Sequence, residues 1–236
     1  MTPLDQAVPM KNIIVAIDGP AGAGKSTIAR HLAQHFSLLN LETGAMYRAF
    51  GLKALRAAVS LDDAAALVQL AAETRISLVA GKDDNTVLLD DEDVTGLIRN
   101  PLVSDAASRV SVFPPIRAWM VRLQQELGAK GGVVMEGRDI GTVVFPNADV
   151  KIYLDATPEV RGIRRYDQLG GAPTVDAEQV LHDLRARDER DKGRADSPLK
   201  PAEDSVLLDS TSMTLAQVLK SAEDIVEARI AALTRS

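Results

Sequence analysis

The sequence contains no cysteine at all. It therefore has no disulfide bonds, no thiol nucleophile and no zinc site built on cysteine ligands. Aromatic residues make up only 3% of the 236 residues, and the formal net charge is −6. Binding to nucleic acid polymers needs a broad basic surface and often stacking rings, so the composition argues against a nucleic acid partner. It does not argue against a single nucleotide held in a local basic pocket.

Long apolar runs are also missing. No run approaches the roughly 20 residues of a membrane-spanning helix. Residues 1–10 contain Asp5 and two prolines and lack the basic-then-apolar layout of a signal peptide. We therefore expect no membrane partner and a cytoplasmic location. The 46% of hydrophobic residues is ample for a packed core.

The central motif is the eight-residue stretch at 19–26, which matches G-x-x-x-x-G-K-[ST] between an apolar run at 13–17 and a helix-like run at 27–35. Glycines let the backbone wrap closely around phosphates, and the helix N-terminus adds its positive dipole end. A glycine-rich turn without a ligand is the alternative, but both the spacing and the setting favour a P-loop. The Lys25 side chain can then reach the β- and γ-phosphates of ATP, and the Ser26 hydroxyl can ligate Mg²⁺. We assign the ATP site to Gly19, Pro20, Ala21, Gly22, Ala23, Gly24, Lys25, Ser26 and Thr27.

Strand-like and helix-like segments alternate along the chain. The predicted strands of the main sheet lie at 13–17, 37–42, 133–136, 150–154 and 205–208. The predicted helices lie at 26–36, 43–58, 62–72, 101–112, 114–127, 158–169, 175–193 and 214–233, with Thr43 as an N-cap. This alternation indicates an α/β fold with a doubly wound parallel sheet.

Residues 76–96 have a different character. Alternating, β-branched stretches flank the turn-forming residues 81–85, which is the signature of a hairpin. A hairpin does not belong in a parallel core, so we interpret this stretch as a small antiparallel insert.

Three charged loops follow predicted parallel strands: the P-loop, residues 43–48 and residues 137–139. In open parallel sheets, ligands bind beyond the carboxyl ends of the strands. We therefore expect Arg48, Arg138 and Asp139 to converge on one crevice.

Arginines also gather on two consecutive helices. Arg187, Arg190, Asp191 and Arg194 fall at i, i+3, i+4 and i+7, so they share one helix face. The preceding helix carries further arginines, across a glycine-rich break at 170–173, namely Arg161, Arg164 and Arg165. This pattern fits a lid that closes over phosphates, and it fits a salt-bridged, exposed helix pair equally well.

Histidines are scarce, and no Ser-His-Asp set is evident. His31 and His35 lie at i, i+4, as metal ligands can, but no H-E-x-x-H glutamate and no obvious third ligand accompany them. We expect both to be ordinary helix residues. A phosphate acceptor is already anionic, so its phosphorylation needs positioning and charge neutralisation more than a general base.

Several motifs together resemble those of bacterial cytidylate kinases, and they cover the chain after the first dozen residues. The specific part is G-R-D-I-G-T-V-V-F-P at 137–146, and the other motifs lie at 17–26, 43–48, 113–117, 187–194 and 207–211. The resemblance implies transfer of the γ-phosphoryl group of ATP, with Mg²⁺, to CMP or dCMP. We expect residues 1–12 to form a flexible tail, and the resemblance implies a single, monomeric P-loop kinase domain at 13–236. Within that domain it implies a monophosphate-binding region with its insert at about 43–112 and a helical lid at about 161–194.

Matching positions carry the family's roles onto this chain. The residues implied for the cytosine edge are Ser108, Arg117 and Asp139, and those for the pentose are Arg187 and Asp191. The residues implied for the acceptor phosphate are Arg48, Arg138 and Arg194, with Thr43 and Tyr47 beside them. We assign catalysis to Lys25, Arg138, Arg164, Arg165 and Arg190. Glu136 stands where an aspartate is frequent, so the metal assignment keeps only Ser26.

Three other classes remain as alternatives. Another small-molecule P-loop kinase, such as a shikimate-type enzyme, would need no residues that read a base edge. A GTPase switch usually carries an N-K-x-D motif, which is absent. The length, acidity and low aromatic content weigh against a nucleic-acid motor.

Overall fold

The computed structural model describes residues 12–79, 85–170 and 176–234. The predicted tail apart from its last residue, the hairpin turn at 81–84 and residues 171–173 of the glycine-rich break lie outside the described residues. Within the described residues, no helix has both the length and the apolar character needed to cross a membrane.

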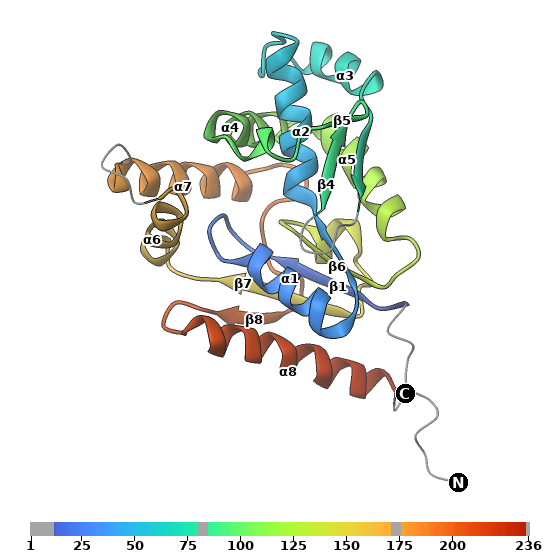
Figure 1. Cartoon of the computed structure of the whole chain (residues 1–236), viewed down its shortest axis with the longest axis vertical. Coiled ribbons are helices and arrows are strands. Elements are labelled where there is room, and N and C mark those ends of the chain that lie inside the picture. The colour runs from blue at the N-terminus through green and yellow to red at the C-terminus, as the bar shows by residue number, and fades with distance from the viewer. Residues whose placement is uncertain (1–11, 80–84, 171–175, 235–236) are drawn as a thin grey trace.

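A five-stranded parallel sheet forms the centre of the molecule (Figure 1). Its strands are β1 (Ile14–Asp18), β2 (Leu39–Glu42), β6 (Val133–Gly137), β7 (Val150–Asp155) and β8 (Val206–Asp209). They lie in the order β2-β6-β1-β7-β8, and every neighbouring pair is parallel. The central strands β1 and β6 are almost wholly buried, as continuous apolar runs require. The predicted α/β fold is confirmed.

Helices follow the strands as the patterns predict. The α-helices are α1 (Lys25–Phe36), α2 (Thr43–Arg56), α3 (Ala64–Ala72), α4 (Pro101–Val110), α5 (Pro114–Gly128), α6 (Pro158–Gln168), α7 (Ala177–Lys192) and α8 (Leu215–Leu233). The described residues also include the 3₁₀ turn η2 (Leu97–Arg99) and the π-helical turn η3 (Ile140–Val144). The prediction that Thr43 caps α2 is wrong. Glu42 is the N-cap residue, and the Thr43 hydroxyl instead donates to the carbonyl oxygen of Glu136 at 2.7 Å.

The predicted insert is confirmed as a separate antiparallel sheet. It consists of β3 (Ile76–Val79), β4 (Thr86–Leu89) and the additional short strand β5 (Glu92–Asp93). Its inner face packs on α2, as Val87 and Phe50 share one buried cluster. This cluster, together with α3, α4 and α5, forms the body drawn above the main sheet in Figure 1.

The main core lies between the sheet and the pair α1 and α8. Ile17, Leu32 and Val226 are fully buried there. Each such side chain contributes about 1.5–3 kcal/mol through the area it removes from water. On the other face, Met135 and Ile140 pack with apolar residues of α5. Packing on both faces fixes the ends of the strands, from which the loops of the site leave the sheet.

Candidate active site

The order of the strands brings the three charged loops together. β6 lies between β2 and β1, so the loops after these three parallel strands leave the sheet side by side. With parts of α4, α5, α6 and α7 they enclose a cleft of about 580 Å³. Ser26, Thr43 and Arg138 line this cleft, one from each loop.

Glycines shape the P-loop between β1 and α1. Gly19 has a φ angle of 149°, and a Cβ atom there would lie 2.0 Å from the carbonyl oxygen of Leu154. No other residue fits such a close approach of two backbones. Gly24, with a φ of 100°, lies at the N-cap of α1 and lines the cleft.

Lys25 and Glu136 form the buried floor of the cleft. The ammonium of Lys25 donates to the carbonyl oxygen of Pro20 at 2.7 Å. Burial, together with the positive charge of Arg138, lowers the pKa of Lys25 to about 7. Burial, together with the charge of Glu42, raises the pKa of Glu136 to about 7. The Oε1 atom of Glu136 is buried and has no hydrogen-bond partner among the described residues.

Asp18, which the sequence patterns did not single out, holds the loop after β6. Its two carboxylate oxygens accept hydrogen bonds from the backbone N–H groups of Ile140 and Gly141 at 2.8 and 2.7 Å. Burial raises the pKa of Asp18 to about 6, although these two bonds oppose the shift. The residues directly before the contact are Arg138 and Asp139, so Asp18 determines where their backbone lies.

One side of the cleft carries a buried ion pair between Arg117 and Asp139. The Arg117 guanidinium lies 5.8 Å from the ring centroid of Tyr47, within cation–π range, and also donates to the carbonyl oxygen of Ser111 at 3.3 Å. The Ser108 hydroxyl lines the same region and has no hydrogen-bond partner among the described residues. This end of the cleft therefore offers a carboxylate, a guanidinium and a hydroxyl to a polar ligand.

The facing side is dominated by arginines around Asp191. Arg138 donates to the Asp191 carboxylate at 2.9 Å, and Arg194 pairs with the same group while donating to the Ser111 hydroxyl at 2.7 Å. Burial alone would raise the pKa of Asp191, but the surrounding arginines hold it below its ordinary value. Burial and the nearby Arg138 lower the pKa of Arg187 to about 10.

Most of the predicted site residues line the cleft. They are Ala21, Gly22, Gly24, Lys25, Ser26, Thr27, Thr43, Tyr47, Arg48, Ser108, Arg117, Arg138, Asp139, Arg165, Arg187, Asp191 and Arg194. Arg30 and Arg99 also line it, although no sequence motif indicates them. Among the described residues, nine cationic side chains and four carboxylates face the cleft, so it is basic in a chain whose net charge is −6.

Five of the predicted site residues do not line the cleft in the described part of the chain. They are Gly19, Pro20, Ala23, Arg164 and Arg190. Arg164 donates to the backbone carbonyl of Ser210 at 2.9 Å, and Arg190 lies 3.2 Å from the Asp105 carboxylate of α4. The catalytic roles of both arginines remain predictions.

The helix pair α6 and α7 combines features of both interpretations of its arginines. Arg161 forms a buried ion pair with Asp188 at 2.7 Å and donates to the P-loop carbonyl of Ala21 at 3.0 Å. Arg185 joins the two helices at the surface through Glu159 at 2.6 Å. The helices are thus salt-bridged to each other, while Arg187 of α7 and other residues of the pair line the cleft.

The model of the cytidylate kinase family matches residues 15–228. This chain belongs to the cytidylate kinase family. The resemblance that the motifs indicate is therefore confirmed, and the chain is one of the P-loop nucleoside monophosphate kinases.

Individual relatives align along nearly their whole length. A cytidylate kinase from Solibacter usitatus is 48% identical over 223 residues, which cover 93% of this chain and 94% of the relative. One from Syntrophotalea carbinolica is 47% identical, with 93% and 94% covered. One from Desulforamulus reducens is 49% identical over 208 residues, with 88% and 93% covered.

Proposed function

We propose that this protein transfers the γ-phosphoryl group of ATP to CMP or dCMP, which yields ADP and CDP or dCDP. The observation that carries the proposal is that one basic cleft contains both the P-loop lysine and the buried Arg117–Asp139 pair. Two nucleotides brought end to end repel each other through their phosphates. The excess of cationic side chains offsets this repulsion.

The donor triphosphate binds in the P-loop, where backbone N–H groups and the N-terminus of α1 attract anions. Lys25 stabilises the charge that develops on the transferred group, which requires the protonated amine. A bound triphosphate favours that form, because an opposite charge nearby raises a pKa that burial has lowered.

The acceptor binds in the remainder of the cleft. Asp139 accepts a hydrogen bond from the amino group of cytosine. Arg117 and Ser108 donate hydrogen bonds to the ring nitrogen and the carbonyl oxygen. Arg187 and Asp191 hold the pentose. The residues that clamp the acceptor phosphate are Arg48, Arg138 and Arg194, beside Thr43 and Tyr47.

Catalysis in this arrangement depends on position and charge. The acceptor phosphate is already anionic, so no side chain needs to remove a proton from it before it attacks. We assign the stabilisation of the transferred group to Lys25, Arg138, Arg164, Arg165 and Arg190. Arg165 lines the cleft, whereas the assignments of Arg164 and Arg190 require these side chains to leave their present partners.

Mg²⁺ fits the floor of the cleft. The buried Oε1 atom of Glu136 has no hydrogen-bond partner among the described residues, and an uncompensated carboxylate oxygen is a ligand that Mg²⁺ prefers. The Ser26 hydroxyl lines the same floor. We therefore add Glu136 to Ser26 as a residue that holds the ion, directly or through water. When bound, Mg²⁺ neutralises charge on the phosphates of ATP.

The proposal is tested by measuring the rate of ADP release from ATP in the presence of each candidate acceptor in turn. We expect CMP and dCMP to accelerate release, and AMP or shikimate to leave it near the rate without acceptor. A shikimate-type kinase would show the reverse, and a switch protein would respond to no small acceptor. We also propose that the protein is a monomer, which size-exclusion chromatography of the same preparation tests. Its cytoplasmic location, which we propose as well, is tested by cell fractionation.

A further inference from the structure

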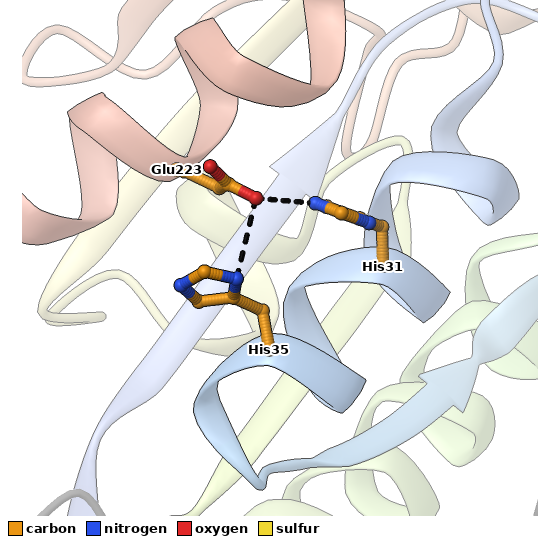
Figure 2. A group of neighbouring side chains, drawn as sticks. All are labelled: His31, His35 and Glu223. Atoms are coloured by element: carbon orange, nitrogen blue, oxygen red, sulfur yellow. Dashed lines mark hydrogen bonds and ion pairs between the residues drawn. The ribbon is translucent and has the colours of Figure 1, made fainter. Parts of the chain in front are cut away.

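A second group of chemically active side chains lies away from the cleft, where α1 packs against α8. His31 and His35 point from one face of α1 toward Glu223 of α8 (Figure 2). The Nε2 atom of His31 lies 2.6 Å, and the Nδ1 atom of His35 3.3 Å, from the same carboxylate oxygen, Oε1 of Glu223. Glu223 is a potential third ligand that the sequence does not reveal, because it lies 192 residues from His31.

We propose that His31, His35 and Glu223 form a binding site for a divalent transition-metal ion of the zinc type. Two imidazole nitrogens and one carboxylate oxygen are borderline ligands that suit Zn²⁺, Co²⁺ or Ni²⁺, and a three-residue set leaves a coordination position for water. One potential ligand atom from each residue lies within 4.8 Å of the other two.

The distances between the potential ligand atoms can be compared with those of a tetrahedral site. Tetrahedral Zn²⁺ with bonds of about 2.0–2.1 Å places neighbouring ligand atoms about 3.3 Å apart. The contact between His35 and Glu223 already has this length, at 3.3 Å. The contact between His31 and Glu223, a hydrogen bond at 2.6 Å, has to open by a rotation of the Glu223 side chain. Glutamate has three side-chain torsions, and terminal torsions of this kind are broad.

The surroundings allow an ion to enter and a water molecule to complete its coordination. The side chains of His31 and His35 are 32% and 42% exposed, whereas that of Glu223 is 14% exposed. The cation Lys220 is nearby, but it lies 3.8 Å from the other oxygen of Glu223 and pairs more closely with Asp224, at 2.8 Å.

The position of the site suggests what a bound ion would do. α1 begins at Lys25, directly behind the P-loop, and its two histidines lie in the last turns of the same helix. Glu223 sits on α8 beside the buried residue Ala222. An ion held by both helices would join the phosphate-binding helix to the C-terminal helix, and it would stabilise the folded chain in proportion to its binding. None of the three ligands lines the cleft.

The test uses the full-length, untagged and nucleotide-free protein, treated with chelator and then titrated with Co²⁺. Four- or five-coordinate Co²⁺ shows strong visible absorption that the six-coordinate aqueous ion lacks. We expect the wild-type protein to develop this absorption with a single Co²⁺ per chain, and Zn²⁺ to abolish it by displacement. The matched control is His182→Gln on α7, which removes an exposed histidine outside the group and should leave the signal unchanged.

Three single substitutions decide the ligand set: His31→Gln, His35→Gln and Glu223→Gln. Each should lose the absorption, and each should lose the rise in melting temperature that Zn²⁺ causes in the wild type. Melting in the presence of chelator verifies that the variants are folded. Wild-type protein without the absorption at millimolar Co²⁺, or an unchanged signal in any of the three variants, would overturn the proposal.

Discussion

The guanidinium of Arg117 donates a hydrogen bond to the carboxylate of Asp139 on the wall of the cleft, across 22 residues of sequence. The two side chains are only 4% and 7% exposed. Two opposite charges buried together offset the loss of hydration that each would suffer alone, and removal of one leaves the other uncompensated. The pair is therefore a rigid polar surface, and in our proposal it recognises the cytosine base.

Asp139→Asn should weaken the preference for CMP. The substitution keeps the size of the side chain but replaces the carboxylate by an uncharged amide. The amide has only one acceptor oxygen, so the hydrogen bond to the amino group of cytosine is weakened. We expect the ratio of kcat/KM for CMP to that for AMP to fall by about 10- to 100-fold, which corresponds to about 1–3 kcal/mol. Asp62→Asn, which removes a surface carboxylate paired with Arg109, is the control. An unchanged ratio in Asp139→Asn would rule out its role in reading the base.

Lys25→Met should reduce kcat far more than it raises KM for ATP. Preorganised charges that face the reacting group act mainly on the transition state, and their removal costs about 10²- to 10³-fold in rate. Lys53→Met on α2 removes a lysine that pairs with Asp90 at 2.5 Å outside the lining of the cleft. In steady-state kinetics, kcat should fall in Lys25→Met and stay near the wild-type value in Lys53→Met. Similar kcat values in the two variants would contradict the role of Lys25.

Asp18→Ala should impair both stability and acceptor binding. It leaves the backbone N–H groups of Ile140 and Gly141 without their acceptor, at about 1–3 kcal/mol for each unsatisfied group. Because these groups fix the turn after Asp139, KM for CMP should rise more than KM for ATP. Asp149→Ala is a matched control, since Asp149 accepts from the N–H of Ile14 at 2.8 Å at the opposite end of the same strand. A loss of stability with unchanged KM for CMP in Asp18→Ala would limit Asp18 to a structural role.

Glu136 should make stability depend on pH. Its pKa is raised from 4.5 to about 7 in the folded state, so the folded protein holds this proton more tightly than the unfolded chain does. The stabilisation is complete below about pH 4.5 and is lost as the pH rises through about 7. The pKa of Lys25 is lowered from 10.5 to about 7, so its contribution to stability rises with pH instead of falling. The wild type and a Glu136→Gln variant both contain Lys25.

The measurement compares wild type with Glu136→Gln by urea unfolding between about pH 5 and about pH 8. The free energy of unfolding of the wild type should fall relative to that of the variant as the pH increases. A difference that stays constant, or that changes in the opposite direction, would show that Glu136 keeps an ordinary pKa in the folded protein.

The sequence predicts the fold well because the relevant signals are local. Apolar runs of strand length separated by amphipathic stretches indicate a parallel sheet, and the carboxyl ends of such strands share an edge. That rule alone leads to the P-loop, Arg48 and Arg138 lining one cleft, as they do. The hairpin at 76–96 is equally local, and only its third strand, β5, was missing from the prediction.

Contacts between distant residues could not be predicted in the same way. Asp18 binds the backbone of residues more than a hundred positions away, and no side-chain pattern encodes an acceptor for N–H groups. Glu223 meets His31 across 192 residues, and only the packing of α8 on α1 brings them together. Arg161 belongs to the arginines predicted to close over phosphates, yet its side chain forms a buried ion pair with Asp188. Charge pattern alone does not separate such structural arginines from those that bind a ligand.

The most direct test of the central claim follows the phosphoryl group itself. ATP labelled in its γ-phosphate is incubated with the protein, Mg²⁺ and CMP, and the products are separated. Our proposal predicts that the label appears in CDP and that none is transferred when CMP is omitted. Label released only as inorganic phosphate, or at the same rate with and without CMP, would contradict it.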